Sequence, residues 1–337
     1  MSEKPETSPL ASIRRRAVLQ VGAAAAFLAA AGPLRAQETD RQPVVLITGT
    51  SSGFGRLMVE GFARQGARVF ATMRGVSGRN APAADELRAL ASGENLSIEV
   101  IELDVLSDES VAAAIGQATA DAGHIDILVS NAGIVVPGPV ELQPPDRFQA
   151  NIETNAYGAM RVIKAVIPHM REAGRGTIIQ MSSALGRAID PMLGGYCASK
   201  LVVEAACDAL GYELAASNIE VAVVQPAGAY PTQFQSNGIR HWEELVASLG
   251  PADRPKLDLY AQHIEAMLAG LEPDTSLDPQ EVADAVLALA AMEFGTRPSR
   301  LTVGPYTDGI DPVNAAHEQL QTDMVGHSPF AQLFTLS

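Results

Sequence analysis

The stretch from Val44 to Gly55 constrains the fold more than any other part of the chain. Residues 44–47, Val-Val-Leu-Ile, form a continuous apolar run, as expected of a strand buried on both faces of a parallel sheet. A glycine-rich turn follows at once, and residues 56–65 are predicted to form a helix closed by Gly66. Glycines let a backbone approach a pyrophosphate, and a helix N-terminus offers unpaired N–H groups to an anion. The stretch therefore predicts a dinucleotide-binding unit. The turn residues expected at the cofactor are Gly49, Ser51, Ser52, Gly53, Phe54 and Gly55.

Strand and helix patterns alternate after this unit. Further strands are predicted at 68–72, 97–103, 125–129, 176–181, 219–224 and 300–303, and helices at 108–122, 146–172, from Tyr196 to about 216, and from Asp278. This alternation predicts a single α/β domain over residues 43–304, with a doubly wound parallel sheet, the Rossmann fold. Ligands of such sheets bind outside the carboxyl ends of the strands. The residues that follow those ends, and that should face one crevice, are Asp104, Val105, Asn131, Ala132, Gly133, Ser183, Pro226 and Gly228.

The regular pattern breaks after Thr232. Residues 233–275 contain several prolines and short helical pieces such as 257–271. An insertion at the mouth of the crevice is either a substrate lid or a structural extension. Residues 305–337 form a C-terminal extension, in which 313–324 could be a helix.

The end of the second strand bears on the choice of cofactor. In NAD-binding units an acidic residue there bonds the ribose 2′-hydroxyl. Here the strand ends Thr72-Met73-Arg74-Gly75, and the next acidic residue is Asp85. A guanidinium suits a 2′-phosphate by charge and by its paired donors. We therefore expect NADP(H), with NAD(H) as the alternative if Arg74 is a solvated loop residue.

Tyr196 and Lys200 stand four residues apart and would share one helix face. A fixed positive charge favours a phenolate and lowers the pKa of the phenol. The pair could therefore exchange a proton near neutral pH, where general acid-base catalysis works best. By itself the spacing also fits an ordinary pair on a helix surface.

Composition excludes several other functions. The net charge of −15 argues against nucleic acid as a partner, because phosphate binding needs clustered Lys and Arg. The six histidines are scattered and the two cysteines, Cys197 and Cys207, fit neither a metal site nor a disulfide framework. No metal is expected.

Residues 1–36 have the layout of an export signal. Arg14, Arg15 and Arg16 precede an apolar run from Ala17 to Gly32, and a small residue, Ala36, stands before a polar segment. Arg15-Arg16 is similar to the twin-arginine signal, which predicts a periplasmic location. The run is too short for a confident membrane span, so no stable span is expected in the mature chain. The alternative is a signal-anchor or an unprocessed basic tail, with the protein in the cytoplasm.

These motifs together resemble the short-chain dehydrogenases/reductases over residues 43–304. The matching positions are Thr48-Gly49-x3-Gly53-x-Gly55, Asn131-Ala132-Gly133, Asn155, Ser183 and Tyr196-x3-Lys200, in family order and at family spacing. The glycine spacing resembles the oxidoreductase branch. Met73 stands where NAD-using members carry aspartate, and the segment from Pro226 to Thr232 has one residue more than the family pattern.

The resemblance implies the chemistry and the catalytic residues Asn155, Ser183, Tyr196 and Lys200. Tyr196 would exchange a proton with the substrate oxygen, Lys200 would lower the pKa of the phenol and bond the nicotinamide ribose, and Ser183 would donate to the carbonyl or alkoxide. Asn155 would hold a water that links Lys200 to solvent. The protein is then expected to be a homo-oligomeric oxidoreductase acting on a small carbonyl or alcohol substrate. The alternative is a dinucleotide-binding or sensing protein that does not turn over.

Overall fold

The computed structural model describes residues 41–334, and the predicted export signal at 1–36 lies outside them. Within this part of the chain, seven strands form one sheet in the order β3-β2-β1-β4-β5-β6-β7, and every neighbouring pair is parallel. This confirms the predicted doubly wound sheet. The strands are β1 Val44–Thr48, β2 Arg68–Met73, β3 Ile98–Glu102, β4 Ile127–Ser130, β5 Gly176–Met181, β6 Ile219–Pro226 and β7 Arg300–Val303.

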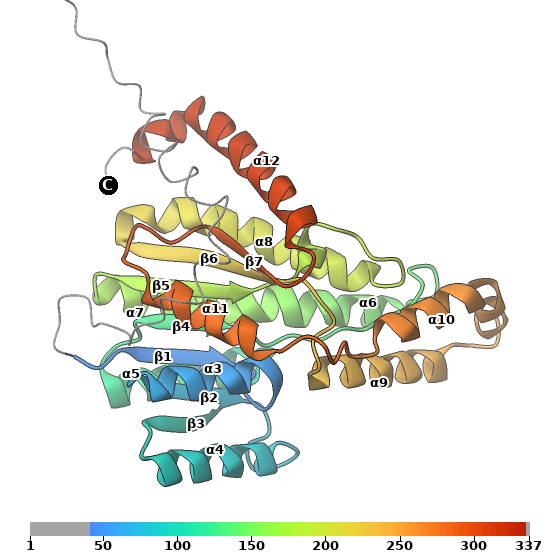
Figure 1. Ribbon diagram of the computed structural model, residues 1–337, viewed down its shortest axis with the longest axis horizontal. Helices are drawn as coiled ribbons and strands as arrows, with labels where there is room; N and C mark the ends of the chain where they lie inside the picture. The colour runs from blue at the N-terminus through green and yellow to red at the C-terminus, as the bar shows by residue number, and fades with distance from the viewer. Residues whose placement is uncertain (1–40, 335–337) are drawn as a thin grey trace, which may run out of the picture.

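Helices cover both faces of the sheet (Figure 1). The main ones are α3 Gly53–Arg64, α4 Ala81–Glu94, α5 Asp108–Ala122, α6 Pro145–Ile152, α7 Ala159–Glu172, α8 Gly194–Leu214, α9 Gln233–Ser248, α10 Ala261–Gly270, α11 Gln280–Ala291 and α12 Thr307–Gly326. Helices α3, α4 and α11 pack on one face of the sheet, and α5, α7 and α8 pack on the other. Every residue of β1 is buried, because apolar side chains point from it into both layers. Short helical turns complete the chain: η1 Glu153–Gly158, η2 Ala184–Gly186, η3 Ala215–Ser217, η4 Arg254–Tyr260 and η5 Pro329–Phe334.

The strand order reverses between β1 and β4, where an open α/β sheet forms its ligand crevice. Side chains join the two strand ends at this point. The Thr48 hydroxyl accepts hydrogen bonds from the backbone N–H groups of Asn131 and Ala132, at 2.9 and 3.0 Å. The Asn131 amide donates to the carbonyls of Thr48 and Gly49. The floor of the crevice is therefore fixed by residues of the two motifs that flank it.

Several elements differ from the sequence-based expectation. Helix α4 was not anticipated. The predicted helix 146–172 is interrupted by a π-helical turn, η1. The segment after Thr232 is not a set of short pieces, because α9 is a 16-residue helix whose first turn is capped by the Thr232 hydroxyl. Helix α12 begins at Thr307 and contains Pro312, so the predicted helix 313–324 starts six residues too late.

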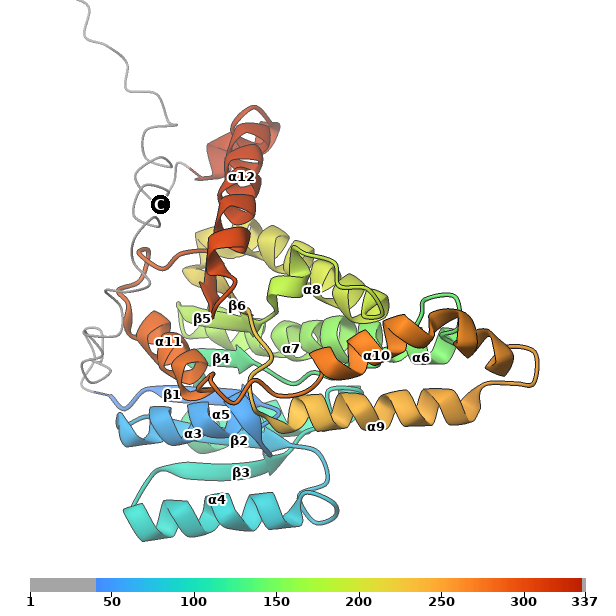
Figure 2. The same ribbon diagram turned by 45° about the vertical axis from the view of Figure 1, so that its right-hand side comes forward.

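The segment after Thr232 lies beyond the carboxyl ends of the strands. Figure 2 shows α9 and α10 side by side and projecting away from the sheet to the right, while α12 rises from the top of the domain. A separate apolar cluster centred on Trp242 and Leu245 of α9 joins these helices to residues after β4. No helix within residues 41–334 is both long and apolar enough to cross a membrane.

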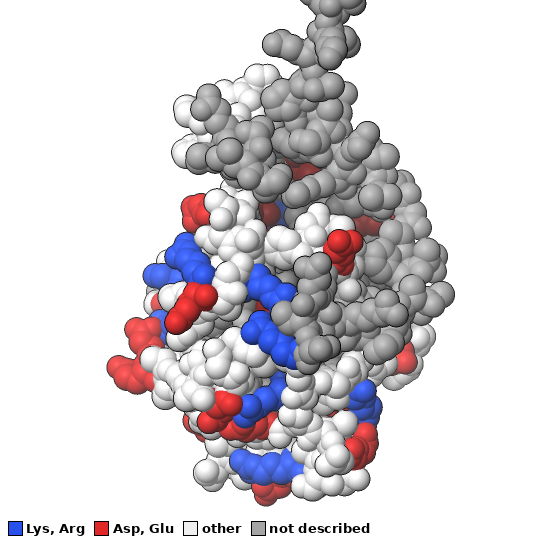
Figure 3. All heavy atoms as spheres, turned by 90° about the vertical axis from the view of Figure 1, so that its left-hand side faces the viewer, with Lys and Arg blue, Asp and Glu red and all other residues white. Residues whose placement is uncertain are grey.

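Charged residues of both signs alternate on the surface. On the face turned to the viewer in Figure 3, which lies at the amino ends of the strands, Lys and Arg stand among Asp and Glu. The basic residues there form no large patch of a single sign among the atoms that the figure colours.

Candidate active site

The glycine-rich turn between β1 and α3 is shaped as a backbone cradle. Gly49 and Gly53 have φ values of +72° and +55°, a region that residues with a side chain rarely adopt. A Cβ atom on Gly55 would lie 2.2 Å from the Gly49 carbonyl oxygen, so only glycine fits there. The turn packs tightly on the strand β4 motif, since a Cβ on Gly49 would lie 2.8 Å from the Ala132 Cα.

The N-terminus of α3 fits an anion such as a pyrophosphate. Ser52 is the N-cap residue and has an extended backbone, but its side chain makes no capping hydrogen bond. The first turn holds no acidic residue. Its N–H groups and the positive end of the helix dipole therefore face outward, next to Ser51 and the glycines. This geometry suits the dinucleotide expected from the sequence.

Arg74 follows β2 near the same crevice. Local burial of its guanidinium lowers its pKa, although the residue as a whole stays exposed, and the charges of Arg79 and Arg240 lower the pKa further. Asp104 acts in the opposite direction. Arg74, from the end of β2, and Arg240, from α9, are thus close enough to repel each other. Arg240 is paired with Glu244 at 2.7 Å, so Arg74 and Arg79 are the cations here that could attract an anionic group.

Other predicted cofactor residues have packing roles in the structure. The Phe54 ring stands edge-on to that of Tyr230, with centroids 5.4 Å apart. The Val105 side chain is buried in the core against Gly158, and its carbonyl accepts a hydrogen bond from Arg161. Gly228 gives room to Leu277 and Pro305. Pro226 is the last residue of β6 and pairs with Val303.

Tyr196, Ser183 and Lys200 come together at the carboxyl ends of β4 and β5. Ser183 lies close enough to the Tyr196 hydroxyl to lower its pKa, and the Ser183 oxygen accepts a hydrogen bond from the Leu185 N–H at 3.1 Å. The Lys200 ammonium lies 5.6 Å from the centroid of the Tyr196 ring and donates to the Met181 carbonyl at 3.0 Å. A Cβ on Gly133 would lie 3.8 Å from the Lys200 Nζ, which places the end of β4 beside the ammonium.

Burial controls the ionisation of this pair. Tyr196 and Lys200 are only 6% and 5% exposed. Burial raises the pKa of Tyr196 above its ordinary value, and the hydrogen bond with Ser183 opposes that rise. Burial also lowers the pKa of Lys200 to about 8, against the attraction of Glu204. Burial of both groups therefore opposes the lowering of the Tyr196 pKa that is expected from Lys200.

The Asn155 side chain links the segment that follows β4 to helix α8. It lies in the π-helical turn, a feature frequent at functional sites, and is fully buried. Its amide group exchanges hydrogen bonds with the backbone N–H and carbonyl of Ile134, at 2.8 and 2.9 Å. It also donates to the Ser199 hydroxyl, which in turn donates to the Tyr196 carbonyl. The side chain thus has protein partners on each of its polar atoms.

Helix α9 contributes an aromatic residue that the sequence-based prediction did not include. The ring of Phe234, in the first turn of α9, meets that of Tyr196 with centroids 5.7 Å apart. A pocket of about 270 Å³ opens between the loop after β5 and α10, and neither Tyr196 nor Phe234 is among the residues that line it. Its lining residues are Asp190, Pro191, Met192, Leu193, His263, Ala266, Met267, Gly270 and Leu271.

Three further residues of the site were not singled out from the sequence. Ser199 bridges Asn155 and Tyr196, Ser182 precedes Ser183, and Glu204 lies one helical turn beyond Lys200. Only the spacing of Glu204 could have indicated a role, since Lys200 and Glu204 share a helix face. Within residues 41–334, no group of three or more His, Cys, Asp or Glu side chains could hold a metal ion.

Known proteins are similar to this chain in sequence and in fold. The model of the short chain dehydrogenase family matches residues 43–243. The uncharacterized oxidoreductase YusZ of Bacillus subtilis is 34% identical over 74% of this chain and 85% of its own length. A short-chain dehydrogenase from Streptomyces avermitilis has a similar structure, with a TM-score of 0.65, 26% identity, and coverage of 86% of this chain and all of that one.

A solved structure with a bound cofactor is also similar. The 3-ketoacyl-(acyl-carrier-protein) reductase from Brucella melitensis, complexed with NADH, has a TM-score of 0.59 and 28% identity over 77% of this chain and 96% of its own. These similarities extend over most of the chain. They are consistent with the three features described above: the glycine cradle, the reversal of strand order, and the group formed by Ser183, Tyr196 and Lys200. The chain is an oxidoreductase of the short-chain dehydrogenase/reductase family.

Proposed function

We propose that this protein is an NADP(H)-dependent reductase or dehydrogenase that interconverts a carbonyl compound and an alcohol, with Tyr196 as the acid and base. The observation that carries the proposal is the position of the Tyr196 phenol at the crevice edge of the sheet, with the Lys200 ammonium 5.6 Å from its ring centroid and Ser183 close enough to lower its pKa. The neighbouring glycine cradle supports a nicotinamide dinucleotide, whose bound form supplies the hydride chemistry.

Each side chain has a separate task in this proposal. Tyr196 gives its proton to the carbonyl oxygen during reduction and takes it back during oxidation. Ser183 donates a hydrogen bond to the same oxygen and stabilises the charge that develops there. Lys200 carries the positive charge that makes proton loss from Tyr196 easier, to the extent that its pKa of about 8 leaves it protonated. Asn155 holds α8 and the β4 motif in register.

The choice of NADP(H) rests on Arg74 and its surroundings. The sequence of β2 ends without an acidic residue, and Arg74 and Arg79 bring positive charge there. The Glu102 carboxylate of β3 is engaged by the N–H groups of Gly75 and Val76. A 2′-phosphate would relieve the mutual repulsion of the two arginines, whereas a ribose hydroxyl would leave it in place. NAD(H) is the alternative, and the similar reductase from Brucella melitensis was solved with NADH.

The pocket beside the lid supports a substrate of moderate size and apolar character. Methionine, leucine and proline side chains form most of its lining, with Asp190 and His263 as polar groups. We propose residues 233–275 as the substrate lid, because Phe234 covers Tyr196 and α10 closes one side of the pocket.

The test is a panel of aldehydes, ketones and quinones offered with NADPH and with NADH. The wild-type protein is expected to oxidise NADPH with at least one compound, and Tyr196→Phe should bind NADPH equally well while turning over several orders of magnitude more slowly. Equal rates for the two proteins would refute the mechanism. Tight NADPH binding without turnover of any compound would favour a sensing protein on this fold.

We also propose export through the twin-arginine route, on the basis of Arg15-Arg16 and the apolar run that follows. A folded protein with a bound dinucleotide is cargo that this route could carry. Fractionation of cells that express the full chain should recover a shortened protein in the periplasm. Recovery of full-length protein in the cytoplasm alone would reject export.

A further inference from the structure

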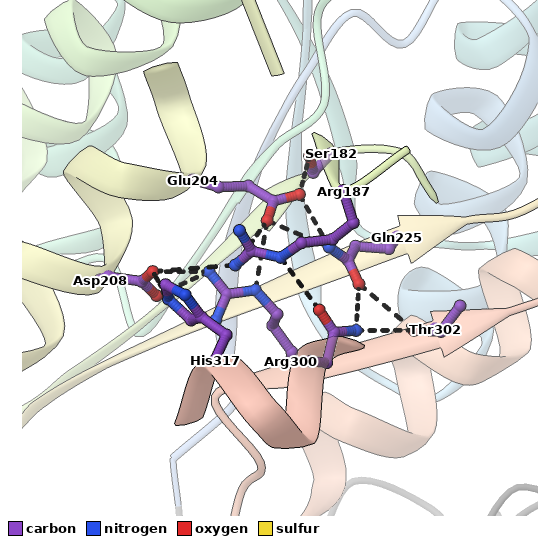
Figure 4. Close-up of polar contacts among 9 residues, drawn as sticks. Ser182, Arg187, Glu204, Asp208, Gln225, Arg300, Thr302 and His317 are labelled. Atoms are coloured by element: carbon purple, nitrogen blue, oxygen red, sulfur yellow. Dashed lines mark hydrogen bonds and ion pairs between the residues drawn. The ribbon is translucent and has the colours of Figure 1, made fainter. Parts of the chain in front are cut away.

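A polar cluster, centred on a buried carboxylate, joins α8 to β6, β7 and α12 (Figure 4). We call it the Glu204 cluster. Its members are Ser182, Arg187, Glu204, Asp208, Gln225, Arg300, Thr302, Asn314 and His317. They come from the end of β5, the following loop, α8, β6, β7 and α12, so the cluster joins the C-terminal extension to the centre of the sheet.

Glu204 is the centre of this cluster and is fully buried. Its carboxylate accepts hydrogen bonds from the Ser182 hydroxyl at 2.5 Å and from the Gln225 amide at 2.9 and 3.0 Å. Arg187 and Arg300 each form an ion pair with it at 3.2 Å. A buried carboxylate with this many partners has a fixed position, because any displacement would leave a buried charge unpaired.

The partners of Glu204 precede residues of the proposed active site in the sequence. Ser182 is followed by Ser183, and Gln225 is followed by Pro226 at the carboxyl end of β6. Lys200 lies one turn before Glu204 on α8. One carboxylate thus contacts the two strand ends that border the crevice and lies on the helix that carries the catalytic ammonium.

Helix α12 completes the cluster. The Asn314 side chain accepts from Arg187 at 3.0 Å and donates to Gln225 at 2.7 Å. Asp208 receives both hydrogen bonds of the Arg300 Nη2 group at 2.7 Å and contacts His317 at 3.1 Å. The C-terminal extension therefore binds two of the four partners of Glu204, Arg187 and Gln225.

We propose that Glu204 is a positioning residue of the reaction: it fixes the strand ends before Ser183 and Pro226 and places a negative charge one turn behind Lys200, and Asn314 of α12 keeps its partners in place. Ion pairs between the fully buried Glu204, the partly buried Asp208 and two partly buried guanidiniums are costly in desolvation, and apolar packing of similar volume is often as stable. Its retention beside the catalytic residues is explained if its geometry serves the site. The inference rests on the proposed function.

The charge of Glu204 gives the proposal a measurable signature. Glu204 raises the pKa of Lys200, against the burial that lowers it to about 8. The other groups facing Lys200 are the Tyr196 ring on α8 and the Met181 carbonyl on β5, and those facing Glu204 are Arg187, Arg300 and, next to them, Asp208 and His317. Removal of the Glu204 charge leaves both guanidiniums less compensated, which also disfavours a charged Lys200. Both effects lower the pKa of Lys200.

The main test is Glu204→Gln, assayed with NADPH and the carbonyl compound that the wild type turns over best. We expect a loss in kcat of about tenfold, a KM for NADPH within twofold of the wild type, and an alkaline limb of carbonyl reduction that moves to lower pH by about one unit. Unfolding of the cofactor-free variant between pH 6 and 10 gives an independent readout. The rise in stability with pH that Lys200 causes should begin at a lower pH than in the wild type.

Glu220→Gln is the matched control. Like Glu204, Glu220 is a largely buried glutamate that pairs with an arginine, in this case Arg297. It lies on β6, away from the crevice, and its carboxylate accepts a hydrogen bond from the Gly295 N–H. This variant should lose stability and keep the wild-type alkaline limb and kcat. The proposal would be overturned if Glu204→Gln had the same kcat as the wild type and the same alkaline limb in its pH profile.

Two variants that keep the Glu204 charge decide the matter if Glu204→Gln does not fold. Ser182→Ala and Asn314→Ala should each lower kcat several-fold without moving the alkaline limb, whereas Gln319→Ala, on the exposed side of α12, should change neither. Wild-type kcat in both variants would overturn the proposal. Tyr196→Phe in the same assay distinguishes failure of the proposed function from failure of the Glu204 proposal. If Tyr196→Phe stays active, the proposed function itself fails, whatever the result with the cluster variants.

Discussion

The ring of Phe234 stands edge-on to the ring of Tyr196, with centroids 5.7 Å apart and planes inclined by 61°. Phe234 belongs to the first turn of α9, which the Thr232 hydroxyl caps. The lid segment therefore touches the proposed catalytic phenol directly and contributes to its burial. Burial is in turn the main reason that the pKa of Tyr196 is raised.

Replacing Phe234 by alanine should expose Tyr196 and weaken substrate binding. Edge-to-face aromatic pairs contribute about 1 kcal/mol beyond the area they bury. We expect KM for the carbonyl substrate to rise about fivefold in Phe234→Ala, with a smaller change in kcat, as measured by steady-state kinetics at saturating NADPH. Phe234→Leu keeps an apolar cover over Tyr196. Its increase in log KM should therefore be less than half of the increase in Phe234→Ala. Identical KM values for the wild type and Phe234→Ala would remove the lid role of this residue.

Replacing Lys200 by methionine should abolish turnover and stabilise the fold. Burial lowers the pKa of Lys200 from 10.5 to about 8, so the native state holds its charge at a cost. That cost is fully present below pH 8 and disappears as pH rises from about 8 to 10.5. The free energy of unfolding at pH 7 should therefore rise by about 1 kcal/mol, after allowance for the lost bond to the Met181 carbonyl. Urea unfolding measures it.

The pH dependence provides the control for that variant. The gain of Lys200→Met over the wild type should be largest at pH 7 and should shrink as pH approaches 10.5, since both states of the wild type then carry a neutral amine. A gain that is constant from pH 7 to 10.5 would show that Lys200 is not the cause.

Two glycines in helices should respond oppositely to alanine. At Gly55 the new Cβ atom would lie 2.2 Å from the Gly49 carbonyl oxygen and 2.6 Å from the Asn131 amide nitrogen, so the cradle must distort. NADPH binding to Gly55→Ala, measured by calorimetry, should weaken by at least tenfold. At Gly116, in α5, a Cβ meets no atom within 4 Å, and alanine should stabilise the protein by about 0.5–1 kcal/mol. Unimpaired NADPH binding to Gly55→Ala would contradict the cradle.

Replacing Arg74 by glutamine should change cofactor selectivity. Loss of a charge-assisted contact to a 2′-phosphate costs about 1.5–3 kcal/mol, which is a tenfold or greater loss in NADPH affinity. NADH affinity should stay within twofold. Arg88→Gln is the control, because Arg88 is an exposed arginine of α4 that pairs with Asp85. If Arg74→Gln weakens NADPH and NADH equally, or neither of them, the NADP(H) preference does not depend on this residue.

The fold was predictable because its signals are local. Apolar runs of strand length, each followed by glycine or a polar residue, predict buried parallel strands, and the alternation with helices predicts how they connect. Helix α4 lacks such a signal, since it buries only Ala84 and Leu87, and α12 buries only Ile310. Helices with so narrow an apolar face have weak periodicity, and their boundaries follow from tertiary contacts.

The catalytic set was predictable for a different reason, because Ser183, Tyr196 and Lys200 occur in one ordered pattern at family spacing. The sequence alone determined which residues meet, since the carboxyl ends of neighbouring parallel strands must share an edge. Only the tertiary structure decided their ionisation, because the burial that raises the Tyr196 pKa and lowers that of Lys200 depends on every neighbour. The same holds for Val105, which its spacing assigned to the cofactor and its packing places in the core, and for Glu204, whose partners are up to 96 residues away.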